Sequence, residues 1–138
     1  LAIASSCFVE NSMRETLRCR YVRYLLERPS SKSIVFCNTD LQARMFLQQV
    51  AADIEEGHLP NDWVIRHTDY LLSTSVNGFM RFMVADLGRP TARDDENVVR
   101  PLMHRCAGYE LNAIFTDELH PYHRAMIGSY MNPRIRRL

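Results

Sequence analysis

The chain has 138 residues, which is the usual length of one globular domain and too short for two. Hydrophobic residues make up 46% and charged residues 24%, a composition that excludes a mainly disordered or fibrous chain. The formal net charge is +1, so no strong overall field attracts nucleic acid or a membrane surface. The longest apolar runs span only a few residues, and we therefore expect no membrane-spanning segment.

The first half of the chain predicts two helices around one strand. Apolar residues recur at steps of three and four over residues 10–28, the pattern of an amphipathic helix, and Pro29 ends it. Residues 33–37 form a continuous apolar run with β-branched members, as in a parallel strand buried on both faces. Residues 38–40 carry side chains that cap helices, so a second helix is expected from there to Gly57.

The second half of the chain predicts two further strands and two further helices. These elements are a strand at 63–65, a helix at 73–87, a strand at 112–116 and a helix at 118–130. We interpret residues 88–108 as a loop insertion because their first part is polar and contains Gly and Pro. Within the insertion, residues 97–106 fit a short helix.

Helices and apolar strands that alternate with short links predict a three-layer α/β domain with a mainly parallel sheet flanked by helices. Ligands of such sheets collect at the carboxyl ends of the strands. Polar residues stand at three of these expected ends, at positions 38–39, 67–69 and 116–117. We therefore expect a binding site along this edge of the single domain.

Three segments at these strand ends carry a family resemblance. They are SIVFCNT at residues 33–39, VIRHTD at 64–69 and AIFTD at 113–117. In this order they resemble motif IV (iiFvnT), the strand ending in lHgd, and motif V (vLvaTD) of the DEAD-box group of superfamily-two RNA helicases. The part of the family that they resemble is its second, C-terminal RecA-like domain, and the resemblance covers residues 8–118.

The resemblance implies a domain that binds RNA or a ribonucleoprotein. It implies RNA contacts for Asn38, Thr39, Arg66, His67 and Thr116. It gives Asp117 a part in cofactor binding, with ATP and Mg²⁺ bound only when a first RecA-like domain carrying Walker A and Walker B is present and active. For this domain alone no cofactor is expected.

Several hydrolysis residues of the family have no counterpart in this sequence. The Gln and Arg that follow lHgd fall near Leu72 and Ser75, and Pro121-Tyr122 replace the Arg-Gly pair after motif V. His123-Arg124 resembles only a small part of motif VI. The arginine finger of that motif neutralises charge in the transition state. We therefore expect a degenerate domain without ATPase activity of its own. The alternatives are an active ATP-dependent RNA helicase half-domain and a noncatalytic protein-interaction domain.

Other catalytic patterns are weaker. His120 and His123 could share a helical face as metal ligands do, but no further ligand spacing joins them, so surface or capping histidines and no metal site are expected. The sequence contains neither a Gly-rich loop with Lys of the Walker A type nor a Ser in a nucleophile elbow.

The cysteines and the first residues bear on where the protein works. The four cysteines, at positions 7, 19, 37 and 106, include no Cys-x-x-Cys pair, so neither a zinc ribbon nor a redox motif is supported. This usage fits a reducing, intracellular compartment, with the nucleus, cytoplasm and mitochondrion all open. Residues 1–7 lack an initiating Met and a basic leader, so we expect a fragment of a longer protein.

Overall fold

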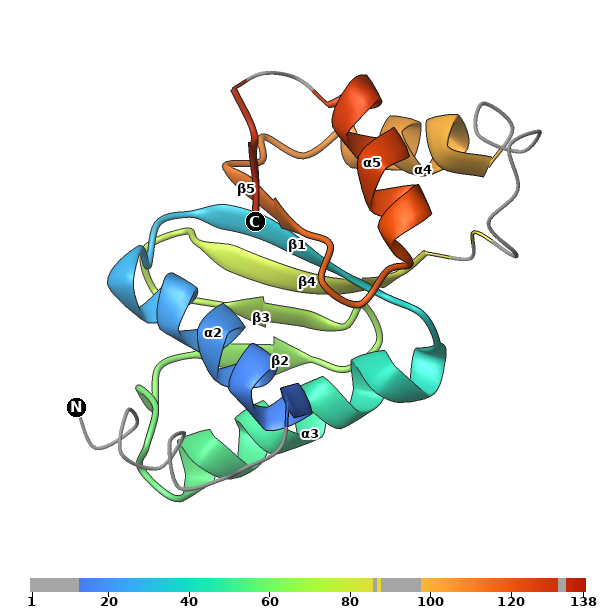
Figure 1. Cartoon of the computed structure of the whole chain (residues 1–138). Helices are drawn as coiled ribbons and strands as arrows, with labels where there is room; N and C mark the ends of the chain where they lie inside the picture. The colour runs from blue at the N-terminus through green and yellow to red at the C-terminus, as the bar shows by residue number, and fades with distance from the viewer. Residues whose placement is uncertain (1–12, 86, 88–97, 132–133) are drawn as a thin grey trace.

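The computed structural model describes residues 13–85, 87, 98–131 and 134–138, and only the backbone of residues 13–19 and 129–130 among them. None of the helices in these ranges is long and apolar enough to cross a membrane. The helices and strands in chain order are α2 (Met13–Glu27), β1 (Lys32–Cys37), α3 (Asp40–Glu55), β2 (Val64–Arg66), β3 (Leu71–Ser73), β4 (Phe79–Val84), α4 (Arg100–Cys106), β5 (Ala113–Phe115), α5 (Pro121–Tyr130) and β6 (Arg136–Arg137) (Figure 1).

The strands form one sheet in the order β2-β3-β4-β1-β5-β6. Strand β1 is parallel to β4 and β5, and β6 is parallel to β5. Strand β3 is antiparallel to both of its neighbours, so β2 runs in the same direction as β4 and β1. The predicted α/β domain with a mainly parallel sheet is confirmed.

Strand β1 lies in the middle of the sheet, and its residues separate two cores. Val35 and Cys37 belong to the core under α2 and α3, whereas Ile34 and Phe36 belong to the core under α4 and α5. Figure 1 shows the two helix pairs on opposite sides of the sheet. The continuous apolar run therefore has both faces covered, as the sequence predicts for a central strand.

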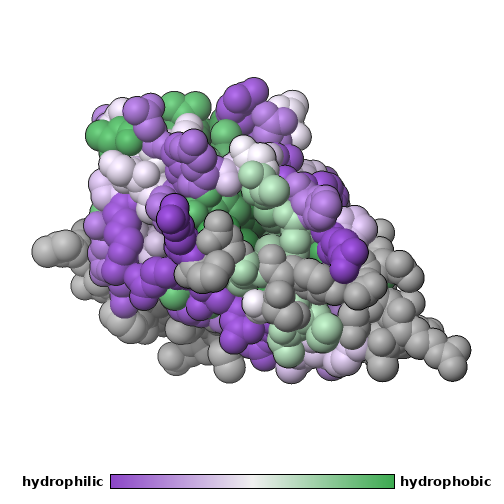
Figure 2. Space-filling model, turned by 90° about the horizontal axis from the view of Figure 1, so that it is seen from above, coloured by the Kyte–Doolittle hydropathy of each residue, from purple (hydrophilic) through white to green (hydrophobic). Residues whose placement is uncertain are grey.

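The face seen from above in Figure 2 belongs to α4, α5 and their connections. Hydrophobic side chains are visible there between hydrophilic ones. The partly buried apolar residues packed on this core include Val98, Met103, Met126, Met131 and Ile135. Among the described residues, the face is therefore a mixed surface of hydrophobic and hydrophilic side chains.

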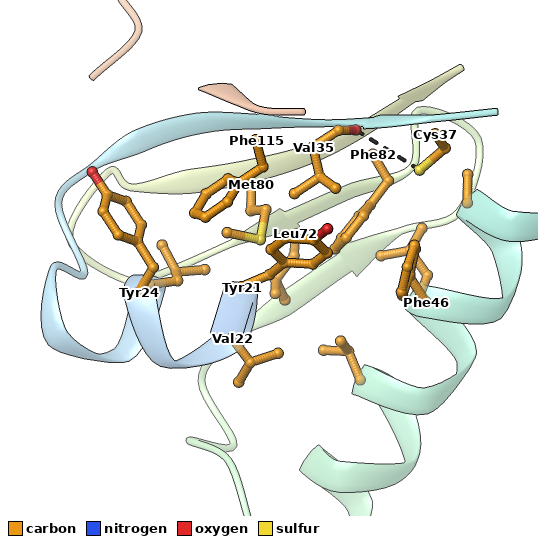
Figure 3. Close-up of a cluster of buried hydrophobic side chains, with 14 of the residues drawn as sticks. Tyr21, Val22, Tyr24, Val35, Cys37, Phe46, Leu72, Met80, Phe82 and Phe115 are labelled. Carbon is orange, nitrogen blue, oxygen red and sulfur yellow. Dashed lines mark hydrogen bonds between the residues drawn. The ribbon is translucent and has the colours of Figure 1, made fainter. Parts of the chain in front are cut away.

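Tyr21 joins α2 to the sheet and to α3 (Figure 3). Its ring meets Phe115 of β5 edge-on at 4.9 Å between centroids and Phe46 of α3 at 5.8 Å. Phe46 in turn stacks on Phe82 of β4 at 5.6 Å. Each such pair adds about 0.5–1.5 kcal/mol beyond the burial of its area. These contacts hold α2 against the end of β5, next to Asp117.

The helix predicted over residues 73–87 is wrong, because this segment forms the end of β3, a turn and β4. Met80 and Phe82 face the first core and Met83 the second, which is the alternation of a strand with both faces covered. The turn contains Asn77 at φ 67°, a conformation that hairpin turns favour and helices exclude. The apolar spacing fits both structures, and the Asn-Gly pair decides between them.

The predicted insertion at residues 88–108 is in part structural core. Helix α4 confirms the short helix that the sequence suggests there, and its residues Leu102 and Cys106 are buried in the second core. Residues 88–97 lie outside the described residues. The other expected helices and strands are present at their predicted places within a few residues.

Candidate functional site

Two neighbouring parallel strands end in polar side chains at the same edge of the sheet. Asn38 and Thr39 follow β1, and Asp117 and Glu118 follow β5. The Asn38 side-chain amide donates to the main-chain carbonyl of Glu118 at 2.5 Å. Two of the three strand ends predicted from the sequence therefore meet, and we call this group of residues, with Gln42 of α3, the rim site.

The first turn of α3 holds the β1 side of the rim site in place. Thr39 is the N-cap of α3, and its hydroxyl oxygen accepts a hydrogen bond from the Gln42 main-chain N–H at 3.1 Å. The Gln42 side-chain oxygen accepts from the Asn38 main-chain N–H at 2.8 Å. The Gln42 side-chain nitrogen donates to Glu118 Oε2 at 2.5 Å. Gln42 is buried and connects the end of β1 to the carboxylate of Glu118.

Asp117 is held from the side of α2. Arg20 donates to Asp117 Oδ1 at 2.6 Å, and its guanidinium lies 5.5 Å from the centre of the Phe115 ring. The Arg20 side chain is 42% exposed, so water screens this ion pair and its contribution to stability is modest. Its clearer effect is to fix the orientation of the Asp117 carboxylate.

The hydroxyl of Tyr21 adds an unusual group beside these carboxylates. Burial raises its pKa well above the ordinary value, and the negative charges of Asp117 and Glu118 raise it further. A hydrogen bond from the hydroxyl to the Asp117 carboxylate raises the pKa as well. Tyr21 therefore stays a neutral phenol throughout the physiological pH range.

Each carboxylate of the rim site keeps one buried oxygen without a hydrogen-bond partner of regular geometry. These atoms are Asp117 Oδ2 and Glu118 Oε1. A buried acceptor without a partner is costly and calls for an explanation, such as an ion or a water that it binds. For Asp117 the neighbouring group is the Tyr21 hydroxyl, which interacts with its carboxylate.

The carboxylate pair is suited to magnesium but does not form a complete cage of protein ligands. Mg²⁺ in phosphate-transfer sites is held by one or two carboxylates, with waters and substrate phosphates as the other ligands. Within the described residues, no group of three or more His, Cys, Asp or Glu side chains could hold a metal ion. The donors at the rim site therefore fit magnesium that arrives with a phosphorylated ligand.

The residues predicted to contact RNA occupy three different environments. Asn38 and Thr39 are exposed at the rim site. Arg66 and His67 are exposed at the end of β2, on the same edge of the sheet but beyond β4 and β3, and Arg66 pairs with Asp69 at 3.1 Å. Thr116 is 3% exposed, so in this conformation its side chain offers almost no surface for direct contact.

The structure adds Gln42, Glu118, Arg20 and Tyr21 to the residues identified from the sequence. A signal for Gln42 is present, because Thr39 and Gln42 have the spacing of a capping box. Glu118 is signalled by its position directly after Asp117 at the end of a buried strand. Nothing in the sequence signals Arg20 or Tyr21, whose roles depend on how α2 packs on β5.

The paired histidines of α5 have a local explanation. His120 is the N-cap residue of the helix, and its Nδ1 accepts a hydrogen bond from the Tyr122 main-chain N–H at 3.1 Å. The capping role expected for one of the two histidines is therefore confirmed for His120. His123 is buried.

No protein-family model matches the chain, and no curated protein or solved structure matches it either. Its function is therefore inferred from the sheet and the rim site.

Proposed function

We propose that the chain is a RecA-like half of a nucleic-acid-dependent ATPase of the helicase type, with Asp117 and Glu118 as its magnesium and water residues. The observation that carries this proposal is the meeting of the parallel strands β1 and β5 at one edge of the sheet, where Asp117 and Glu118 lie beside Asn38. In P-loop NTPases an acidic residue after a buried strand holds magnesium. The proposal takes up the active half-domain, one of the alternatives that the sequence leaves open.

The rim-site residues divide the work between them. Bound magnesium would neutralise charge on the phosphates. Asp117 would bind the ion while Arg20 holds its Oδ1. Glu118 would accept a proton from the attacking water while Gln42 holds its Oε2.

The proposal requires a phosphate-binding loop from outside these 138 residues, because the sequence contains no Gly-x-x-x-x-Gly-Lys motif. A first RecA-like domain would be the natural source. Purified residues 1–138 are accordingly expected to show no ATPase activity. RNA-stimulated turnover by this chain alone would contradict that expectation.

Binding of single-stranded RNA at the same edge of the sheet is the second part of the proposal. Exposed amide, hydroxyl, guanidinium and imidazole groups suit the sugar–phosphate backbone. The exposed donors are Asn38, Thr39, Arg66 and His67. The rim would place RNA directly beside Glu118, because Asn38 contacts both solvent and the Glu118 main chain.

A metal titration of the protein that also carries the phosphate loop, with nucleotide present, tests the carboxylate site. Mn²⁺ replaces Mg²⁺ at oxygen sites and broadens nearby NMR signals. We expect Mn²⁺ to broaden the amide signals of Asn38, Asp117 and Glu118 first, and Asp117→Asn to remove this selectivity. Glu55→Gln, at an exposed carboxylate at the far end of α3, is the matched control and should behave as wild type. Equal broadening around Glu55 and Glu118 would overturn the magnesium assignment.

The water-activating role of Glu118 is tested in the protein that also carries the phosphate loop. Removing a general base lowers turnover by roughly 10²- to 10⁴-fold. Glu118→Gln should lower kcat by this factor and leave nucleotide binding unchanged. Wild-type turnover in the variant would exclude the role.

A further inference from the structure

Strand β6 is one edge of the sheet, and within the described residues no strand pairs with its outer side. The Arg136 main-chain N–H donates to the Asn112 carbonyl on the β5 side at 2.9 Å. The Leu138 N–H donates likewise to the Ile114 carbonyl at 2.8 Å. Because the main-chain groups of successive residues in a strand point to opposite edges, the N–H and C=O of Arg137 point to the open edge. The edge therefore offers a main-chain donor and acceptor to an added strand.

Arginine side chains lie on both faces of this edge. Ile135 packs on the second core and Leu138 on the first. Since side chains alternate along a strand, Arg136 lies on the α2 side of the sheet and Arg137 on the α5 side. Both are exposed, and neither takes part in the ion pairs found among the described residues. Residues 119–138, which form α5 and β6, contain four arginines and no Asp or Glu, so this edge attracts acidic groups.

Helix α5 holds the Arg137 side chain in place. Arg137 Nη1 donates to the Arg124 main-chain carbonyl at 3.0 Å. The same atom lies over Gly128, where a Cβ built on the glycine would meet it at 2.8 Å, too close for an ordinary contact. The missing side chain at Gly128 therefore makes room for the guanidinium. A guanidinium carries five N–H donors, so donors remain for a carboxylate, and a side chain already held in place loses less entropy on binding.

We propose that the open edge of β6 binds an extended acidic segment of a partner protein, which adds to the sheet as a strand. Main-chain hydrogen bonds at Arg137 supply the pairing, and carboxylates on Arg136 and Arg137 supply the selectivity. A second copy of this chain does not fit the edge, because pairing two β6 strands brings their arginines together. RNA carries the required charge but has no peptide groups to pair with the strand. Since the strand is short and the charges are exposed, binding is weak and falls with salt.

Fluorescence anisotropy of this chain with a labelled peptide that alternates glutamate and valine tests the site. We expect Arg136→Ala combined with Arg137→Ala to weaken binding about three- to tenfold, as for the loss of two exposed ion pairs. Gly128→Ala keeps both charges and favours the helix, but it displaces the Arg137 guanidinium and should also weaken binding. Arg66→Ala, on the opposite edge strand, is the matched control and should bind the peptide as wild type does. Equal affinity of the wild type and the double arginine variant would overturn the proposal.

Two further measurements separate strand addition from attraction between charges alone. A peptide with proline in place of valine keeps every charge but loses main-chain donors, so it should bind more weakly. Hydrogen exchange of the Arg137 amide should slow when the valine peptide binds, whereas the Arg136 amide, already bonded to Asn112, should not change. Unchanged exchange at Arg137, or equal binding of the two peptides, would overturn the proposal. Oligouridylate binding that depends on Arg136 and Arg137 as strongly as peptide binding does would also overturn it, in favour of a general polyanion surface.

Discussion

The rim site and the β2–β3 hairpin end at the same edge of the sheet, yet they are built in different ways. At the rim site, Gln42 is buried and Asp117 and Glu118 are partly buried, with Tyr21 and Phe115 packed beside them. On the hairpin, Val64 is 56% exposed, and Arg66 forms an ion pair with Asp69, only three residues further along the chain. Polar residues at a strand end become a preorganised site only where buried neighbours fix them, since preorganisation needs rotamers locked by packing.

Charging the central strand should give the largest effect. Val35→Asp places an unpaired charge in the first core and should lower the free energy of unfolding by more than about 4 kcal/mol, enough to unfold the domain. Val64→Asp, at the exposed hairpin strand, should change it by less than about 0.5 kcal/mol. Thermal melts followed by circular dichroism distinguish the two. Similar melting temperatures for both variants would contradict the prediction that the central strand is buried and the hairpin strand is not.

Deleting one hydroxyl tests how Tyr21 supports the rim site. The buried Tyr21 hydroxyl donates a hydrogen bond to the Asp117 carboxylate. Tyr21→Phe should therefore lower the free energy of unfolding by about 1 kcal/mol, measured by urea denaturation. Tyr24→Phe, whose ring packs on Phe115 from the same helix, is the control and should have a smaller effect. An unchanged free energy of unfolding in Tyr21→Phe would show that this hydrogen bond contributes nothing to stability.

The second core should lose stability at alkaline pH. Burial raises the pKa of the Cys106 thiol from 9.0 to about 11, although Arg105 and Arg81 oppose the shift. Between these values the unfolded chain loses the thiol proton and the folded chain keeps it, so stability falls as pH rises. The loss is about 1 kcal/mol near pH 10. Denaturation of wild type and Cys106→Ala across pH 8–11 should show a flatter profile in the variant, and parallel profiles would refute the shift.

The smallest expected effect concerns RNA, and it distinguishes the two regions by charge. Arg66→Ala removes a cation. It should make the slope of the logarithm of the oligouridylate binding constant against the logarithm of the salt concentration shallower by about one. Asn38→Ala removes a neutral donor and should weaken binding without changing that slope. Fluorescence anisotropy at several salt concentrations measures both. Identical slopes in wild type and Arg66→Ala would show that the hairpin does not contact RNA.

Much of the fold could be predicted from local pattern, and the missed part has a clear cause. Strand β1 was recognisable because a continuous apolar run needs cover on both faces. Strand β4 was not, because the apolar residues at positions 76, 79, 80 and 83 fit the spacing of a helix as well. The Asn77–Gly78 pair carried the deciding turn signal.

The candidate site divides in the same way. Asn38, Thr39 and Asp117 could be predicted at the carboxyl ends of strands, because that rule needs only strand assignments. The contact between Gln42 and Glu118 could not, because it depends on β1 and β5 being direct neighbours. Strand order in a sheet is set by long-range packing. The contacts of Asp117 with Arg20 and of Glu118 with Gln42 therefore could not be predicted from the sequence.

The central place of β1 also has a consequence for synthesis on the ribosome. Both of its sheet partners, β4 and β5, come later in the chain, and the Thr74 contact to Pro29 already spans 45 residues. At about 5–20 residues per second, several seconds pass before either edge of β1 can be paired. During this interval residues 34–36 are an apolar strand with two open edges, the kind of segment that nascent-chain chaperones protect.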